Sequence, residues 1–195
     1  MSDLPTLLLD MDGPLADFDR HFWDRCQERG FAFDVDSCDA QRHRYFTEHI
    51  PNRRERRHAR AMVDEPGWFR DLPVTSGAQA GVAELLDHFD VWVCTKPLEA
   101  NASCLNDKHA WLVEHFPALS DRLITAPDKS LVRGAVLLDD APKPEWFDRA
   151  TWRPVIFPAP FNVDLFPDLP RWGWGHNPHD IVEIVSLAAT KEHAR

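Results

Sequence analysis

Two aspartates, Asp10 and Asp12, lie one residue apart where the apolar run of residues 7–9 ends. Gly13 and Pro14 follow, and they predict that a strand stops here and that both acids lie on a turn. In a parallel α/β sheet, ligands bind beyond the carboxyl ends of the strands. Two carboxylates so close together are costly unless a cation neutralises them or they share a proton. The pair therefore indicates either a metal site or a proton-sharing dyad.

Three later strand-like segments also end near side chains that could act on a charged substrate. Taken alone, each ending has an ordinary structural explanation, such as a turn, a cap or a solvated charge. Their occurrence in order along the chain, each near the carboxyl end of a strand, is hard to attribute to chance. The endings are Thr95 after residues 91–94, Lys129 shortly after residues 123–124, and Asp139 with Asp140 after residues 136–138.

Phosphoryl transfer is the chemistry that would use this set of groups. A carboxylate can attack phosphorus in line and form an aspartyl-phosphate. A second acid can protonate the leaving oxygen and then deprotonate the attacking water. A hydroxyl and an ammonium can bind the nonbridging phosphate oxygens and offset the charge of the transition state. The terminal acids would form an all-oxygen site, which suits Mg²⁺.

Short apolar runs alternate with helical patterns along most of the chain. The runs are rich in aliphatic residues and bounded by turn residues, as expected for strands that are covered on both faces. This alternation predicts an α/β fold with a doubly wound, Rossmann-like parallel sheet. The expected strands are 7–9, 91–94, 123–124, 136–138 and 155–157, and the expected helices lie near 78–89, 105–116 and 181–188.

Residues 17–75 interrupt this alternation, and we call them the helical insert. After an expected helix near 18–29, the segment is polar and helical in pattern. We predict a small insertion that covers the carboxyl ends of the strands, so that residues 1–16 and 76–195 form the core domain. The basic run at 53–57 is explained by a solvated helix face or, alternatively, by a surface that attracts phosphate.

The composition excludes several classes of protein. The 195 residues fit one domain with a modest insertion, and 44% are hydrophobic, which is enough for a core. A formal net charge of −10 disfavours binding to polymeric nucleic acid and to anionic membranes. The apolar runs are shorter than a membrane span, the amino terminus lacks a basic start, and the four cysteines form no C-x-x-C pair. We expect a cytoplasmic protein, and a homodimer is left open.

The four endings resemble the four signature elements of the haloacid dehalogenase-like phosphatase superfamily. A closer similarity is to the 5′(3′)-deoxyribonucleotidase family, and it covers about residues 5–190. The D-x-D-G-x-x-A-D-F and G-[FW]-F-R-x-L strings are its narrower part. The segments that carry the similarity are 10–18, 66–72, 93–97, 108–112, 127–129 and 137–140.

The resemblance implies a role for each of the four acids. Asp10 would be the nucleophile, and Asp12 would be the general acid and base. Asp10 and Asp140 would bind Mg²⁺ through their carboxylates, and Asp12 would bind it through its backbone carbonyl. Asp139 would lie close to the metal and orient water.

Phosphate binding is implied for Thr95 and Lys129. Lys96 adds a second cation beside Thr95, at a position where the family typically has serine. It could tighten phosphate binding or change which sugar is accepted, or it could point to solvent. Pro14 is another departure from the family pattern, and it restricts Gly13 but removes no catalytic group.

In this family the insertion forms a helical cap whose aromatic side chains embrace the base. Stacking on a base is worth roughly 1–3 kcal/mol per contact in nucleic-acid systems. For Phe18 and Phe69, packing in the core is an equal alternative. The candidates for the substrate pocket are Phe18, Tyr45, Phe46, Trp68 and Phe69.

The sequence thus predicts a Mg²⁺-dependent phosphomonoesterase that hydrolyses (deoxy)nucleoside monophosphates through an aspartyl-phosphate. Its partner would be a small-molecule nucleotide. A phosphatase for another small phosphoester, such as a sugar phosphate, is an alternative that polar rather than aromatic lining would favour. A noncatalytic binding protein of the same fold is another, although the intact acids argue against it. A dehalogenase would not need Asp12 for proton transfer.

Overall fold

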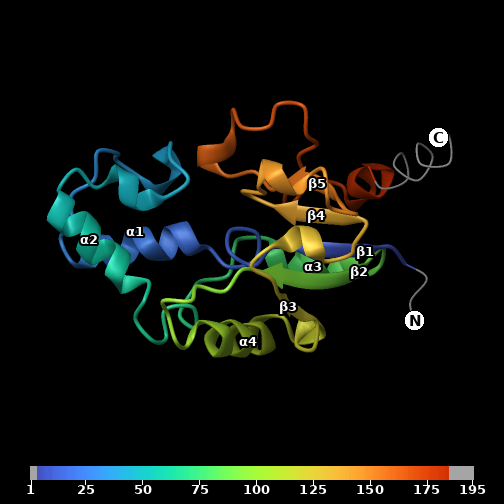
Figure 1. The fold of residues 1–195 in the computed structure, drawn as a ribbon, viewed down its shortest axis with the longest axis horizontal. Helices are drawn as coiled ribbons and strands as arrows, with labels where there is room; N and C mark the ends of the chain where they lie inside the picture. Colours follow the sequence, from blue (N-terminus) through green and yellow to red (C-terminus); the bar gives the residue numbers. More distant parts are fainter. Residues whose placement is uncertain (1–3, 185–195) are drawn as a thin grey trace.

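A parallel sheet of five strands forms the centre of the molecule (Figure 1). The computed structural model describes residues 4–184. The strand order is β3-β2-β1-β4-β5, and every neighbouring pair is parallel, which confirms the predicted α/β fold. The strands are β1 (Thr6–Leu9), β2 (Asp90–Thr95), β3 (Leu123–Thr125), β4 (Val136–Asp139) and β5 (Arg153–Ile156).

The central strand, β1, determines which residues meet at the carboxyl edge of the sheet. Its leucines are fully buried, as is typical of a parallel sheet that is covered on both faces. Leu9 pairs with Val93 of β2 and with Leu138 of β4. This register places Asp10 beside Asp139, and the backbone N–H of Asp10 donates to the carbonyl of Leu138 over 2.9 Å.

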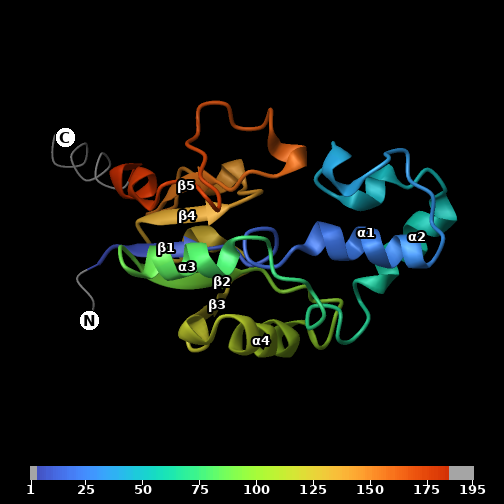
Figure 2. The same ribbon diagram turned by 180° about the vertical axis from the view of Figure 1, so that it is seen from behind.

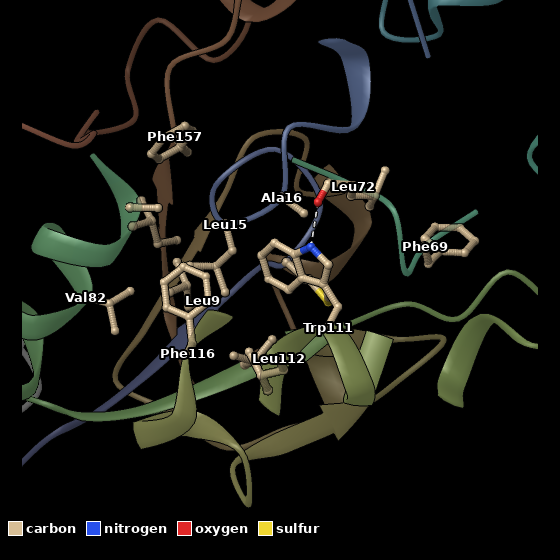
Figure 3. Close-up of a cluster of buried hydrophobic side chains, with 14 of the residues drawn as sticks. Leu9, Leu15, Ala16, Phe69, Leu72, Val82, Trp111, Leu112, Phe116 and Phe157 are labelled. Carbon is tan, nitrogen blue, oxygen red and sulfur yellow. Dashed lines mark hydrogen bonds between the residues drawn. The ribbon is translucent and has the colours of Figure 1, made fainter. Parts of the chain in front are cut away.

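The two faces of the sheet are covered by different kinds of structure. On one face, Val82 of α3 and Trp111 of α4 belong to the same buried cluster as Leu9 (Figure 3). On the other face, Leu8 belongs to a cluster with Trp146, which lies in a short 3₁₀ turn. The helices and turns of this part of the chain are α3 (Ala78–Leu86), α4 (Cys104–His115), η3 (Pro117–Leu119), η4 (Lys129–Leu131), η5 (Pro144–Trp146) and η6 (Pro160–Asn162).

The helical insert lies beyond the carboxyl ends of the strands, at one end of the long axis of the molecule (Figures 1 and 2). All of its residues are described, and none belongs to a strand of the sheet. Its first helix begins where the Asp17 carboxylate accepts a hydrogen bond from the backbone N–H of Arg20. The division into a core and a cap stays a prediction. The elements are α1 (Phe18–Glu28), η1 (Cys38–Ala40), η2 (Phe46–His49) and α2 (Arg53–Met62).

Two crossings join the helical insert to the sheet, and they run side by side. Ala16 on the outgoing crossing and Val74 on the returning crossing form an antiparallel bridge. The indole N–H of Trp111 donates to the carbonyl of Leu72 over 2.7 Å, which ties the returning crossing to α4 (Figure 3). These contacts fix the start of α1 at the edge of the sheet.

Residues 178–184 form a helix, which confirms the first part of the helix expected at 181–188. Val185 and Ala188 of that expectation lie outside the described residues. The last strand begins earlier than expected, because Pro154 is tolerated on an edge strand such as β5. Within residues 4–184, no helix is long and apolar enough to cross a membrane. A cytoplasmic location and a homodimer stay predictions.

Candidate active site

One buried ammonium joins two acids at the carboxyl edge of the sheet. Lys129 Nζ lies 2.7 Å from Asp10 Oδ1 and 2.7 Å from Asp139 Oδ2. Asp10 Oδ1 also accepts a hydrogen bond from the backbone N–H of Met11 over 2.8 Å. Burial lowers the pKa of Lys129, but the two carboxylates together raise it by more. The pKa of Lys129 therefore lies above its ordinary value. Lys129 is therefore charged.

The position of Lys129 follows from a tight turn after β3. The Asp128 carboxylate accepts hydrogen bonds from the backbone N–H and the hydroxyl of Ser130, over 3.0 and 2.6 Å. This Asx cap starts the short turn η4 and directs Lys129 toward β1 and β4. The indole N–H of Trp152 donates to the Lys129 carbonyl over 3.0 Å and holds the turn against the sheet.

Three carboxylates share this small space with one ammonium. Asp10, Asp139 and Asp140 each offer an oxygen, and these oxygens lie within 4.8 Å of one another. Burial raises the pKa of Asp10 to about 7, Asp139 and Asp12 raise it as well, and Lys129 opposes the shift. Burial, followed by Asp139 and Asp10, raises the pKa of Asp140 well above its usual range. One ammonium is therefore not enough to keep all three acids ionised, and a bound cation would favour their charged forms.

The residues of this cluster fit a hard divalent cation. Every offered ligand is a carboxylate oxygen, the donor type that Mg²⁺ prefers. A Cβ atom on Gly13 would lie 2.5 Å from Asp140 Oδ2, and Gly13 has φ +94°, so a side chain here would be strained and would displace this carboxylate. The backbone N–H of Ala141 donates to Asp139 Oδ1 over 2.8 Å and fixes the orientation of the Asp139 carboxylate.

A second buried lysine, Lys108, contacts Asp12. Lys108 of α4 is fully buried, and its Nζ lies 2.6 Å from Asp12 Oδ2 and 2.8 Å from Thr95 Oγ1. The ammonium is 4.9 Å from the centre of the Phe69 ring. Asp12 Oδ1 is buried and has no hydrogen-bond partner among the described residues. An unpaired buried carboxylate oxygen is costly, so this atom is suited to meet a ligand.

Comparison with known proteins shows the family of this chain. The family model of the 5′ nucleotidase, deoxy (pyrimidine), cytosolic type C proteins matches residues 4–183. The chain belongs to this family. It is 36% identical over 171 residues to a candidate 5′(3′)-deoxyribonucleotidase of Bordetella pertussis, covering 86% of this chain and 90% of that protein. It is 30% identical over 206 residues to the human cytosolic-type 5′(3′)-deoxyribonucleotidase, covering 95% and 97%.

Solved structures show the same fold at low sequence identity. A haloacid dehalogenase-superfamily hydrolase of Geobacter sulfurreducens has a TM-score of 0.54 at 16% identity and covers 93% of this chain and 96% of its own. A haloacid dehalogenase-like hydrolase of Xanthomonas campestris has a TM-score of 0.51 at 16% identity and covers 96% and 98%. The predicted family, the fold and the class of enzyme, a phosphatase hydrolase, are confirmed.

In this nucleotidase-family chain, β2 ends at a threonine that faces the site. Thr95 is fully buried, and its hydroxyl accepts the hydrogen bond from Lys108, so Thr95 and Asp12 share one ammonium. The next residue, Lys96, is exposed. Within residues 4–184, its side chain forms no hydrogen bond or ion pair, and its role in phosphate binding stays a prediction.

Three of the five aromatic candidates lie together beside Lys108. The ring centres of Phe18 and Trp68 are 6.1 Å apart, and those of Phe18 and Phe69 are 6.2 Å apart. Phe69 contacts the Lys108 ammonium, which brings this aromatic cluster next to Asp12. The indole N–H of Trp68 is buried without a hydrogen-bond partner among the described residues.

The other two aromatic candidates, Phe46 and Tyr45, differ in burial. Phe46 is buried, and its ring centre is 5.4 Å from those of Trp23 and Phe33. Tyr45 is 60% exposed, and its ring is 5.6 Å from the guanidinium of Arg44. The ring of Phe22 connects Phe46 to the cluster, because its centre lies 6.3 Å from that of Phe46, 6.5 Å from that of Phe18 and 6.2 Å from that of Trp68. Tyr45 instead points to solvent. All five pocket roles stay predictions.

Two residues near the acids had no assigned role in the sequence. Lys108 occupies the buried stripe of α4, together with Cys104, Trp111 and Leu112. A lysine on an otherwise apolar helix face is a signal of a buried counter-charge, and that signal was available in the sequence. Asn162 is fully buried and donates to the Asp140 carbonyl over 2.8 Å; its irregular, proline-rich loop offered no such signal.

Proposed function

We propose that this chain is a Mg²⁺-dependent phosphomonoesterase that hydrolyses (deoxy)nucleoside monophosphates through an aspartyl-phosphate on Asp10. The observation that carries the proposal is the pairing of two charged clusters. Asp10, Asp139 and Asp140 offer a cation site, and Asp12 with its Lys108 partner lies beside it. The relatives from Bordetella and from human are named as deoxyribonucleotidases, which supports a deoxyribonucleotide as the substrate.

The acid cluster would hold the metal ion. Asp10, Asp139 and Asp140 supply carboxylate oxygens, and the backbone carbonyl of Asp12 is a fourth candidate ligand. When bound, Mg²⁺ reduces the repulsion between the phosphate and the acids and polarises the phosphoryl group. The remaining chemistry falls to the side chains of the chain.

Asp10 is the proposed nucleophile. Its Oδ1 is held by the Met11 N–H and by Lys129, which leaves Oδ2 for in-line attack on phosphorus. A bond forms between Oδ2 and phosphorus while the bond to the ester oxygen of the nucleoside breaks. Lys129 and the Thr95 hydroxyl would bind the nonbridging oxygens and offset their charge.

Asp12 is the proposed proton carrier. Lys108 holds Asp12 Oδ2, so that the unpaired Oδ1 is the atom that can carry a proton. Oδ1 would protonate the leaving ester oxygen and then take a proton from the water that hydrolyses the aspartyl-phosphate. Because Lys108 also contacts Thr95, one ammonium positions both the proton carrier and a phosphate ligand.

The helical insert, residues 17–75, is the proposed cap over the leaving nucleoside. The aromatic cluster of Phe18, Trp68 and Phe69 lies next to Asp12, on the side where the leaving group would emerge. A base stacked on such a cluster gains roughly 1–3 kcal/mol per contact without base-specific hydrogen bonds. Trp68 and Phe69 are buried and Phe18 is half-buried, so Phe18 is the ring of the cluster that a base would reach first.

A substrate panel tests this proposal. We would measure phosphate release with Mg²⁺ from 5′ and 3′ monophosphates of ribonucleosides and deoxyribonucleosides, and from hexose phosphates. We expect hydrolysis of the nucleotides, no turnover without a divalent cation, and trapping of labelled phosphate on the native enzyme but not on Asp10→Asn. Faster release from hexose phosphates would overturn the substrate class. Activity that survives in Asp10→Asn would overturn the nucleophile.

A further inference from the structure

Helix α2 presents four arginines on one side. Arg53, Arg56, Arg57 and Arg60 have the i, i+3, i+4, i+7 spacing that places side chains on one face of a helix. These four side chains line a cavity of about 480 Å³ that opens to solvent. We call this feature the arginine cavity. Arg53, Arg57 and Arg60 are exposed and Arg56 is half-buried, so the cavity is an open, charged groove rather than an enclosed apolar pocket.

No acid among the described residues 4–184 forms an ion pair with the arginines of the cavity. Seven other arginines in this range pair with acids. Arg56 donates through Nε and Nη2 to the Ile50 carbonyl, over 2.9 and 2.7 Å, which fixes its guanidinium without neutralising it. Like charges at these spacings destabilise a helix, so the cluster is unfavourable until an anion binds.

The arginine cavity is separate from the catalytic acids. In both views, α2 lies at the outer end of the helical insert, away from the sheet (Figures 1 and 2). The acid cluster lies at the carboxyl edge of the sheet, on residues that follow β1 and β4. The two features therefore have opposite charge and different locations.

We propose that the arginine cavity binds an oligophosphate, a small ligand with three or more negative charges, at a second site. Guanidinium groups bind phosphate oxygens in a bidentate manner, and four of them match several phosphate groups rather than one. A concave site favours a small ligand over a polymer. The net charge of −10 on the whole chain also repels an acidic macromolecule, whereas a compact anion meets only the local field.

The test is calorimetric titration with inorganic tripolyphosphate in metal-free buffer at fixed ionic strength. We expect one saturable site in the native protein, and a Kd that is about tenfold weaker or more in the double variant Arg57→Gln/Arg60→Gln. Arg54→Gln is the matched control, because Arg54 is an exposed arginine of the same helix that does not line the cavity. It should change Kd by less than about twofold. Arg57→Lys/Arg60→Lys keeps the charge but loses the bidentate geometry, so its Kd should be intermediate.

Three results would overturn the inference. One is the lack of saturable binding by the native protein. Another is equal weakening in Arg54→Gln, since this would indicate general attraction to a basic helix. The third is loss of nucleotide hydrolysis in Arg57→Gln/Arg60→Gln, because the arginines would then serve the catalytic site. If no nucleotide is hydrolysed by the native protein, the proposed function fails, while the titration still tests the arginine cavity.

Discussion

The edge of the sheet and the helical insert differ in whether their cationic side chains have acid partners. At the edge, every buried ammonium contacts an acid: Lys129 bridges Asp10 and Asp139, and Lys108 contacts Asp12. In the insert, Arg53, Arg57 and Arg60 of α2 are exposed and form no ion pair with an acid among residues 4–184, and the aromatic rings pack on one another. The edge is positioned by strand register and the insert by side-chain packing. Substitutions at the edge are therefore expected to act mainly on the rate, and substitutions of the packed rings of the insert mainly on stability.

Lys129→Met is the sharpest test of this contrast. The variant leaves three close carboxylates without their ammonium, and a phosphate without one of its ligands. We expect kcat/KM to fall by about 10³-fold or more. In metal-free buffer, the free energy of unfolding should fall by about 3–5 kcal/mol, because a buried ion pair is broken. Activity assays and urea unfolding measure the two effects.

The outcome of this variant separates two roles of Lys129. Mg²⁺ added to the metal-free buffer should restore part of the lost stability, since the cation also neutralises the acids. Raising Mg²⁺ above the concentration used in the activity assay should not restore the rate. If Mg²⁺ recovers full activity, Lys129 acts only by neutralising the cluster, and its proposed contact with phosphate is wrong.

Lys108→Met should have a smaller effect on the rate. The variant keeps the stem of the side chain, and it removes the ammonium that holds Asp12 Oδ2 and the Thr95 hydroxyl. We expect kcat to fall by about 10²-fold, because the proton carrier loses its fixed position. Lys96→Met, which removes an exposed charge at the same strand end, should lose about tenfold or less. Steady-state kinetics of both variants rank the two lysines. The reverse order would assign the main phosphate contact to Lys96.

The lysines of the edge also show how far the sequence determines the site. Lys129 could be predicted because it follows a strand, and the carboxyl ends of parallel strands converge on one edge. The same rule brought Asp10, Thr95 and Asp139 together. Lys108 was missed because its location depends on the packing of α4 against the sheet. Helical spacing shows that Lys108 lies on the buried face, but it does not show which acid is opposite.

The helical insert was predicted less completely for the same physical reason. Its helical character follows from periodicity and agrees with the structure, in which α1 and α2 lie between β1 and β2. The orientation of neighbouring aromatics depends on where a turn begins. The 3₁₀ turn η2 begins at Phe46, whose ring packs inward, while Tyr45, one residue before it, remains exposed. No periodic pattern distinguishes these two rings in the sequence.

Phe46→Ala and Tyr45→Ala test that difference within the insert. Phe46 packs on Trp23 and Phe33, so its removal should lower the free energy of unfolding by about 3 kcal/mol. Tyr45→Ala should change it by less than about 0.5 kcal/mol, because the ring is exposed. Urea unfolding measures both, and Tyr45→Ala is also assayed for KM. A tenfold rise in KM for Tyr45→Ala would place this ring against the substrate rather than in solvent.

Asp19→Asn addresses an acid of the insert whose pKa is raised mainly by burial. Asp19 is half-buried in the first turn of α1. Burial raises its pKa to about 7, a hydrogen bond with Gln41 opposes the shift, and the charges of Asp17 and Asp12 add to it. An unfolded aspartate has a pKa near 3.8, so the native state holds this proton more tightly. The loss of folding free energy caused by ionising Asp19 is therefore absent below about pH 4. It increases between pH 4 and pH 7 and reaches its full size above pH 7.

The amide introduced by Asp19→Asn would not carry that charge at any pH. At pH 8 the variant should be more stable than the native protein by about 1–2 kcal/mol, since the loss of a favourable charge at a helix start removes part of the gain. At pH 4 the two proteins should have nearly equal stability. Urea unfolding in metal-free buffer at both pH values measures the difference, and Asp24→Asn, which replaces an exposed acid on the same helix, is the control with no pH-dependent gain. A gain of equal size at pH 4 would mean that the shape of the side chain, and not the buried charge of Asp19, limits the stability of the insert.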